Sequence, residues 1–189
     1  LLVLCLCSCW SKRELNTLAI VLGTGLDVGD QPDTLKLTAQ VVKAGEIGSG
    51  PASQGGGAAG EKAYVNISNT DKSVLSAVRG ITHMQNRRLY FSHNEVLIFS
   101  SDLARLDIAE GLDAFTRDYE ARMNVHILIS RGKASEILEE DVELEKMPAL
   151  HISGTMENQQ ANSETVVVTL RDFAIATLSG PTAPVAPMI

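Results

Sequence analysis

All three cysteines of this 189-residue chain lie within its first nine positions, at Cys5, Cys7 and Cys9. The rest of the chain contains no thiol, so it forms no disulfide, no cysteine-based metal site and no cysteine nucleophile. A folded domain built from it must be held together by burial and hydrogen bonding alone. The length is sufficient for one hydrophobic core of ordinary size.

The apolar stretch Leu1–Leu6 is too short to span a bilayer, which needs about 20 apolar residues. Such a run before small residues is typical of the end of a signal peptide. The sequence Leu6-Cys7-Ser8-Cys9 matches the bacterial lipobox, an aliphatic residue and two small residues before an obligatory cysteine. We therefore expect residues 1–8 to be a signal-peptide remnant, Cys9 to carry a diacylglyceryl anchor, and residues 9–17 to be a lipid-anchored tether. The alternative is a buried hydrophobic terminus with incidental cysteines.

The composition is that of a globular, acidic protein. The hydrophobic fraction is 44% and the formal net charge is -7. The first value argues against bulk disorder. The second gives no attraction to phosphate backbones or anionic headgroups, so we expect no nucleic-acid partner. Membrane attachment would then depend on the lipid, because two acyl chains are about what stable anchoring requires.

Short apolar runs rich in β-branched residues predict strands. A turn containing Pro32 separates the first two runs, between Asp30 and Asp33. The runs are LAIVLGTGLD, LKLTAQVV, EVLIF, NVHILIS and ETVVVTL.

Helical spacing accounts for other segments. Val74, Ala77, Val78 and Ile81 give an i, i+3, i+4, i+7 stripe in KSVLSAVRGI. A second helix is expected from Ser101-Asp102 onward, with Ile108, Leu112 and Phe115 on its apolar face. Two acid-first pairs at i, i+4 support that helix, Asp113 with Arg117 and Asp118 with Arg122.

Two shorter helices are expected further on, in KASEIL and in FAIATL. Thr169 and Asp172 form a capping signal before FAIATL, and Gly180-Pro181 ends it. With several consecutive strands lacking a helix between them, the pattern favours an α+β fold, a mixed β-sheet with α-helices packed on it. We expect this domain to occupy residues 18–180.

The loops give no sign of a phosphate site. Residues 45–60 are glycine-rich and are expected to form a flexible loop. Neither that loop nor Gly23-Thr24-Gly25 is followed by the lysine and hydroxyl of a P-loop. The run EEDVELEK is expected to be a solvated face, and the proline-rich residues 181–189 are expected to be a linker.

No catalytic, cofactor-binding or metal-binding residue is predicted. The four histidines, His83, His93, His126 and His151, do not share a helix at ligand spacing. Ser92, His93 and Asp102 are the nearest candidates for a hydrolase triad, but no nucleophile elbow frames the serine. The paired carboxylates Glu139-Glu140-Asp141 lie in the run expected to be solvated.

A long block from Arg87 to Leu138 closely resembles the Ger(x)C spore-germination lipoproteins. The segment CWSKRELNTLAIVLGTGLD from Cys9 is similar to their mature N-terminus. Further similarity is found in TAQVV, AYVNISNTDKSVLSAVR and VTLRDF, in the same order. The lipobox departs from the family's usual form at Cys7 and Ser8, and the glycine-rich loop is longer.

The resemblance implies the first domain of a three-domain germination lipoprotein, the C subunit of a nutrient germinant receptor. Such subunits sit on the outer face of the spore inner membrane and assemble with polytopic A and B subunits. The resemblance implies no enzyme activity and no cofactor. We expect the docking surface near RRLYFSHNE and the helix bearing Arg117 and Arg122, with Tyr90, Phe91 and Phe115 in the core rather than at the interface.

Two other functions remain as alternatives. A solute-binding lipoprotein would capture the nutrient directly in a pocket, commonly one lined by aromatic side chains. Aromatic residues make up only 4% of this chain, and Trp10 lies at the tether. An exported hydrolase acting on spore cortex or membrane would need a catalytic set that the sequence does not display.

Overall fold

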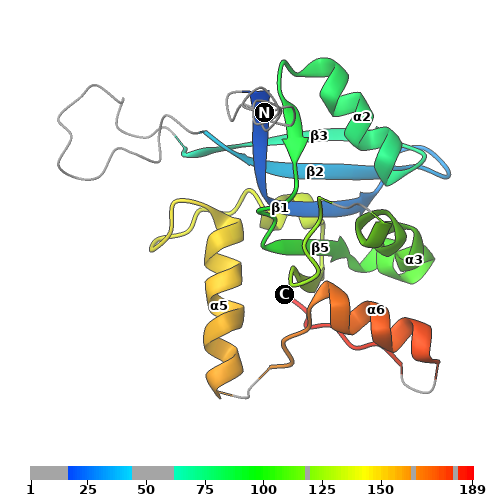
Figure 1. Ribbon diagram of the computed structural model, residues 1–189, viewed down its shortest axis with the longest axis vertical. Helices are drawn as coiled ribbons and strands as arrows, with labels where there is room; N and C mark the ends of the chain where they lie inside the picture. The colour runs from blue at the N-terminus through cyan, green and yellow to red at the C-terminus, as the bar shows by residue number, and fades with distance from the viewer. Residues whose placement is uncertain (1–16, 44–61, 118–119, 163–164, 181–182) are drawn as a thin grey trace, which may run out of the picture.

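The computed structural model describes residues 17–43, 62–117, 120–162, 165–180 and 183–189. Over these ranges the chain forms a mixed sheet with strand order β3-β2-β1-β5-β6, and β4 pairs with the start of β1 (Figure 1). The strands are β1 (Leu18–Val28), β2 (Leu35–Val42), β3 (Tyr64–Asp71), β4 (Arg88–Tyr90), β5 (Val96–Ser100) and β6 (His126–Ser130). The helices are α2 (Val74–Met84), α3 (Ser101–Arg117), α4 (Ala134–Ile137), α5 (Pro148–Asn162) and α6 (Leu170–Ser179).

Strand β1 organises the sheet. One of its edges pairs antiparallel with β2, and β3 continues that antiparallel ladder. Its other edge pairs parallel with β4 near Leu18 and with β5 from Gly23 onward. Strand β6 then pairs parallel with β5. The predicted α+β class with a mixed sheet is therefore confirmed.

Helices cover both faces of the sheet, which explains the uninterrupted apolar run of β5. Successive side chains of a strand point to opposite faces. Leu97 and Phe99 join the larger core cluster with residues of α2, α3 and α6. Val96 and Ile98 join a second cluster with residues of α4 and α5. All four side chains have 0% exposure, as a strand covered on both faces requires.

Two glycines of β1 allow α4 and α5 to approach the sheet closely. A Cβ added to Gly23 would lie 2.7 Å from the Cβ of Ala149 in α5. One added to Gly25 would lie 3.2 Å from the Cβ of Ala134 in α4. The Gly23-Thr24-Gly25 sequence thus serves helix-to-sheet packing.

A buried carboxylate at the end of β1 caps α4. Asp27 is 3% exposed, and its Oδ1 accepts a hydrogen bond from the backbone N–H of Ala134 at 2.6 Å. Its Oδ2 accepts a second from the N–H of Ser135 at 3.0 Å. The adjacent Lys133 supplies no side-chain cap, so the carboxylate satisfies the helix's orphan donors across a large sequence separation.

The predicted helix ends are confirmed. The Thr169 side chain accepts from the Asp172 N–H and the Asp172 side chain returns to the Thr169 backbone, which completes the capping box of α6. Gly180, at the other end, has a φ of 70°. Helix α3 begins at Ser101 as expected, but its backbone departs from helical geometry at Asp107, whose Oδ1 accepts from the N–H of Ala109 at 2.8 Å.

The outer edge of β6 is covered by two separate segments. ETVVVTL was expected to be a strand, and this is wrong, because only a single bridge forms between Thr169 and His126 before α6 begins. Further along β6, Ile129 donates its N–H to Pro187 O and accepts from Ile189, each at 2.9 Å. These contacts satisfy backbone groups that an open sheet edge would expose. The linker role expected for 181–189 stays a prediction.

Candidate docking surface

The predicted docking segment RRLYFSHNE, residues 87–95, contacts the rest of the domain through strand pairing, an ion pair and a hydrogen bond. Strand β4 pairs with Leu18–Ile20, and Arg88 Nη2 lies 3.1 Å from Glu120 Oε1. The Glu120 side chain is only 5% exposed, whereas the Arg88 side chain is 54% exposed, so the ion pair joins a buried carboxylate to a solvated guanidinium. Ser92 Oγ donates to the Glu120 carbonyl at 2.9 Å, which ties the same segment to the residues after α3.

Two of the three aromatic residues expected in the core lie there, and the third, Tyr90, is only half-buried. Phe91 and Phe115 are 3% and 4% exposed, and their rings meet edge to face with centroids 5.8 Å apart. Such a pair adds stability beyond its burial. Tyr90 is half-buried, and its ring meets that of the exposed His93 at 5.9 Å. Phe91 and Phe115 therefore support the fold and are not available to a partner.

The two arginines expected on one helix lie in different settings. Helix α3 ends at Arg117, whose Nε lies 2.6 Å from Asp113 Oδ1. The hydrogen bond to Asp113 raises the pKa of the Arg117 guanidinium above its ordinary value. Arg122 lies beyond the helix, in the exposed turn before β6, so its assignment to that helix is wrong. Asp118, its expected partner, lies outside the described residues.

A groove between α2 and α3 adjoins the predicted segment, with a volume of about 640 Å³. Val78 and Ala114 contribute apolar surface, while Arg79 and His83 stand one helical turn apart on α2. The charged lining is mixed, because it includes Arg79, Arg88, Arg117, Glu110 and Asp113. None of the residues described along this groove is aromatic.

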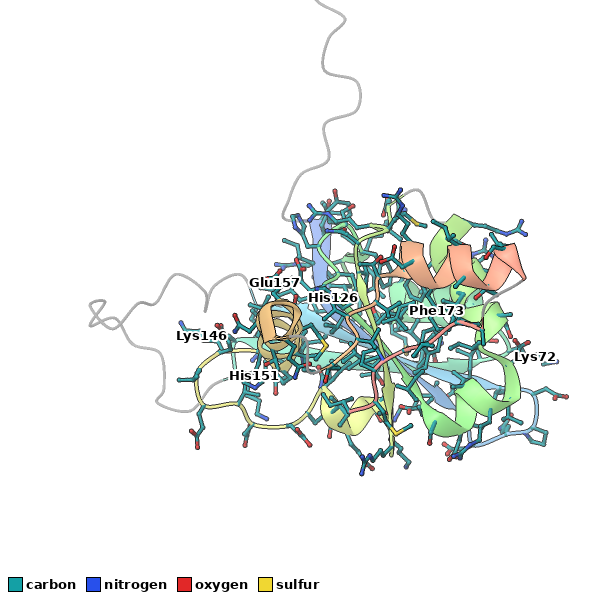
Figure 2. All side chains as sticks on the ribbon, turned by 90° about the horizontal axis from the view of Figure 1, so that it is seen from below. Lys72, His126, Lys146, His151, Glu157 and Phe173 are labelled. Atoms are coloured by element: carbon teal, nitrogen blue, oxygen red, sulfur yellow. The ribbon has the colours of Figure 1, made fainter. Side chains whose placement is uncertain are left out.

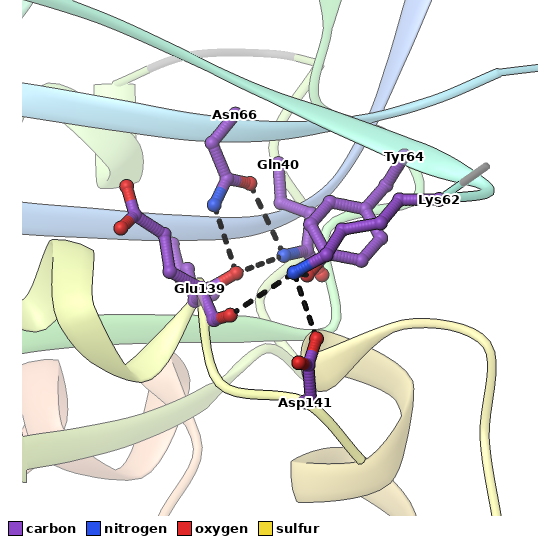
Figure 3. Close-up of polar contacts among 7 residues, drawn as sticks. Gln40, Lys62, Tyr64, Asn66, Glu139 and Asp141 are labelled. Atoms are coloured by element: carbon purple, nitrogen blue, oxygen red, sulfur yellow. Dashed lines mark hydrogen bonds and ion pairs between the residues drawn. The ribbon is translucent and has the colours of Figure 1, made fainter. Parts of the chain in front are cut away.

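One carboxylate of the acidic run, that of Asp141, forms an ion pair at the surface. Lys62 Nζ lies 2.8 Å from Asp141 Oδ1 and donates to the Glu139 carbonyl at 3.4 Å (Figure 3). The hydrogen bond to Asp141 raises the pKa of Lys62. Asp141 remains 89% exposed, as a solvated run predicts.

Next to this pair, an amide network formed by Gln40 and Asn66 holds α4 and α5 against the sheet (Figure 3). Gln40, with 0% exposure, donates from Nε2 to the Leu138 carbonyl at 2.7 Å. Its Oε1 accepts from the Ala149 N–H at 3.0 Å, and Asn66 Nδ2 donates to the same Leu138 carbonyl at 2.8 Å. The network satisfies the end of α4 and the start of α5 with side chains from β2 and β3. Nothing in the sequence pattern indicated it.

The residues weighed for catalysis are not brought together. Ser92 and His93 precede β5, whereas Asp102 follows it and pairs with Arg105 at 3.6 Å. Five residues of strand separate the two ends by about 16 Å. His126 lies in β6, and its buried Nδ1 has no hydrogen-bond partner among the described residues. Figure 2 shows His126 and His151 on different elements, β6 and α5.

The described part of the chain shows neither a metal site nor a membrane-spanning helix. It contains no group of three or more histidine, cysteine, aspartate or glutamate side chains arranged to hold a metal ion. None of its helices combines the length and the apolar character needed to cross a bilayer. Cys9, the predicted lipidation site, lies outside the described residues.

Comparisons with known proteins match nearly the whole chain. The family described as the spore germination protein N-terminal domain matches residues 11–189. Spore germination protein KC of Bacillus subtilis is 30% identical over 192 residues, covering 98% of this chain and 46% of the relative. The same organism's spore germination protein YndF is 31% identical, covering 84% of this chain and 44% of that protein. Its putative spore germination protein YfkR is 32% identical, with coverages of 79% and 38%.

The chain spans less than half the length of each of these three relatives. No solved structure matches it.

Proposed function

The chain belongs to the spore germination protein N-terminal domain family, and from that membership we propose that it is part of a germinant receptor. Specifically, it is the first domain of a three-domain, lipid-anchored C subunit that the receptor needs for its assembly or function. The observation that carries this proposal is the family match over residues 11–189, together with relatives named as spore germination proteins.

The proposed location is the outer face of the spore inner membrane, with Cys9 carrying the diacylglyceryl anchor. Strand β1 begins at Leu18, nine residues after Cys9. Fully extended, nine residues span about 30 Å. The domain then stays within that distance of the bilayer, where polytopic A and B subunits present their exposed loops.

Anchoring supports assembly by raising effective concentration. A tether of this length turns a weak docking contact into an intramolecular one at millimolar effective concentration. The domain itself then needs only a modest surface for its partners. Nucleic acid is not proposed as a partner, since the chain has a net charge of -7.

Direct capture of a nutrient by this domain is the second candidate, and the groove between α2 and α3 is the observation that favours it. Arg79 and Glu110 supply opposite charges there, as recognition of an amino acid would require. The open, mixed-charge lining without aromatic residues makes this the weaker candidate. Titration of the domain with single nutrients separates the two, because a receptor-assembly domain shows no saturable binding.

A Cys9→Ala variant at native expression level tests the anchored assembly. We expect recovery of the A and B subunits with this chain from solubilised spore membranes to fall about tenfold or more. Thermal unfolding of the domain should be unchanged, because Cys9 precedes β1. Cys5→Ala is the matched control and should leave recovery intact. Undiminished recovery with Cys9→Ala would refute lipid anchoring as the basis of assembly.

A further inference from the structure

A second groove runs between α3 and α6, which lie side by side in Figure 1 and contact each other. Its volume is about 540 Å³. Leu112 of α3 contributes to its lining, and α6 contributes Ile175 and Leu178. These two α6 side chains are 53% and 86% exposed, and Met123 at one end is 40% exposed. The domain therefore leaves a contiguous apolar trough open to solvent.

The two threonines and the aspartate that line this trough already have partners on their own helices. Thr116 Oγ1 donates to the Asp113 carbonyl at 3.1 Å, and Thr177 Oγ1 donates to the Phe173 carbonyl at 2.8 Å. The Asp113 carboxylate pairs with Arg117. The trough consequently offers apolar surface and few free hydrogen-bonding groups. Such a surface fits a row of hydrophobic side chains from a partner better than it fits a polar solute.

One end of the trough is basic. A neighbouring cavity of about 490 Å³ shares Met123 and Arg171 with it and adds Arg122. Both arginines are exposed, and within the described residues neither guanidinium has an ion-pair partner. The nearby Asp172 carboxylate is engaged by Thr169 at 2.7 Å in the capping box. Two arginine cations and one carboxylate, that of Asp172, thus border this end of the apolar trough, in a protein of net charge -7.

We propose that the α3–α6 groove receives an amphipathic helix of a partner protein, whose carboxylates pair with Arg122 and Arg171. A third helix packs onto two others by fitting its side-chain ridges into the groove between them. Anchors at i, i+3, i+4 and i+7 would lie in the trough. Arginine with carboxylate gives bidentate hydrogen bonds that fix direction as well as register.

The charges argue against two other occupants. A second copy of this chain would bring Arg171 with its own α6, and its Asp172 is already engaged in the cap. An anionic bilayer is attracted by a broad basic face, whereas among the described residues only these two arginines line the trough and its neighbouring cavity. The inference rests on the proposed function in one respect, that the partner is one of the polytopic receptor subunits.

Charge introduction into the groove tests the proposal in the full anchored chain. Leu178→Glu and Arg171→Glu should each reduce recovery of the polytopic subunits by about tenfold, as loss of an interface hot spot does. Leu144→Glu is the matched control, because Leu144 is 89% exposed in the acidic run and lies outside the groove. All three side chains are exposed, so thermal unfolding should remain within a few degrees of wild type.

Binding of designed peptides tests the chemistry of the occupant. The probe is a labelled 18-residue helix with leucines at i, i+3, i+4 and i+7 and two glutamates at one end, a length of about 27 Å. Fluorescence anisotropy should show binding to wild type and about tenfold weaker binding to Arg122→Glu/Arg171→Glu. A peptide with lysines in place of the glutamates should show the reverse preference.

The outcomes distinguish failure of this inference from failure of the proposed function. If the wild-type chain recovers no polytopic subunit, the proposed function fails. If wild type, Leu178→Glu and Arg171→Glu recover equal amounts, the groove proposal is overturned and the receptor role stands. Binding to phosphatidylglycerol vesicles that Leu178→Glu abolishes would overturn it in favour of a lipid surface. A concentration-dependent dimer abolished by Leu178→Glu would overturn it in favour of self-association.

Discussion

At the scale of single residues, Asp27 links the central strand β1 to helix α4, which begins 107 residues further along the chain. Its two carboxylate oxygens satisfy the first N–H groups of α4, at 2.6 and 3.0 Å. Asp27→Ala would leave both donors buried without a partner, and each such group costs about 1–3 kcal/mol. We expect the free energy of unfolding, measured with denaturant, to fall by about 2–4 kcal/mol.

Asp30→Ala is the matched control for that change. Asp30 is an exposed acid in the following turn, and its replacement should alter stability by less than about 0.5 kcal/mol. If the two variants unfold at the same denaturant concentration, the Asp27 carboxylate does not support α4.

At the scale of elements, the close approach of α5 to β1 depends on Gly23. A Cβ at this position would meet the Cβ of Ala149 at 2.7 Å, and neither atom can rotate away. Gly23→Ala should therefore cost about 1–3 kcal/mol through overpacking. Gly154→Ala in α5 is the control, because a Cβ there meets nothing within 4 Å, and it should raise stability by about 0.5–1 kcal/mol.

A second substitution tests whether the contact with Ala149 is the reason why Gly23→Ala destabilises the domain. Ala149→Gly removes the atom that a Cβ at residue 23 would meet, so Gly23→Ala/Ala149→Gly should recover part of the lost stability. Chemical denaturation of the four variants gives the coupling directly. Strictly additive losses would mean that Gly23 matters for another reason.

The sequence pattern predicted those strands and helices whose own residues show a clear apolar run or an apolar stripe at helical spacing. The buried runs of β1, β2, β5 and β6 and the stripes of α2, α3 and α6 all follow from it. Strands β3 and β4 and helix α5 did not follow. In β3 part of the tertiary contact is made by amides, since Asn66 donates to the Leu138 carbonyl and Asn69 donates to the Ala77 carbonyl. Helix α5 buries Ile152 and Met156 but has few other apolar positions on that face.

The sequence pattern also could not predict which face of α6 would line the proposed α3–α6 groove. The spacing in FAIATL predicted a helix but did not say which apolar side chains the core would use. Phe173 packs inward, whereas Ile175 and Leu178 line the groove beside α3. That assignment depends on where α6 lies against α3, which is a tertiary property. Likewise, Arg122 and Arg171 line one cavity only in the folded chain, because they lie far apart in the sequence.

At the scale of the whole molecule, each proposed component has a separate location. The proposed lipidation site Cys9 precedes β1, the core lies on both faces of the sheet, and the apolar groove lies between α3 and α6. The described part of the chain contains no group of histidine, cysteine or acidic side chains arranged to hold a metal ion, and family membership links the chain to spore germination. A receptor-assembly role requires only that the anchored domain present a surface to its membrane partners.

The measurement that tests this account most directly is dipicolinate release from spores that lack the gene. Single nutrients serve as triggers, and a non-nutrient trigger serves as the control. The account predicts loss of response to one nutrient class with the control response intact, and restoration by the wild-type gene. Spores in which the response to every nutrient is unchanged, with no other receptor expressed, would contradict a role in nutrient reception.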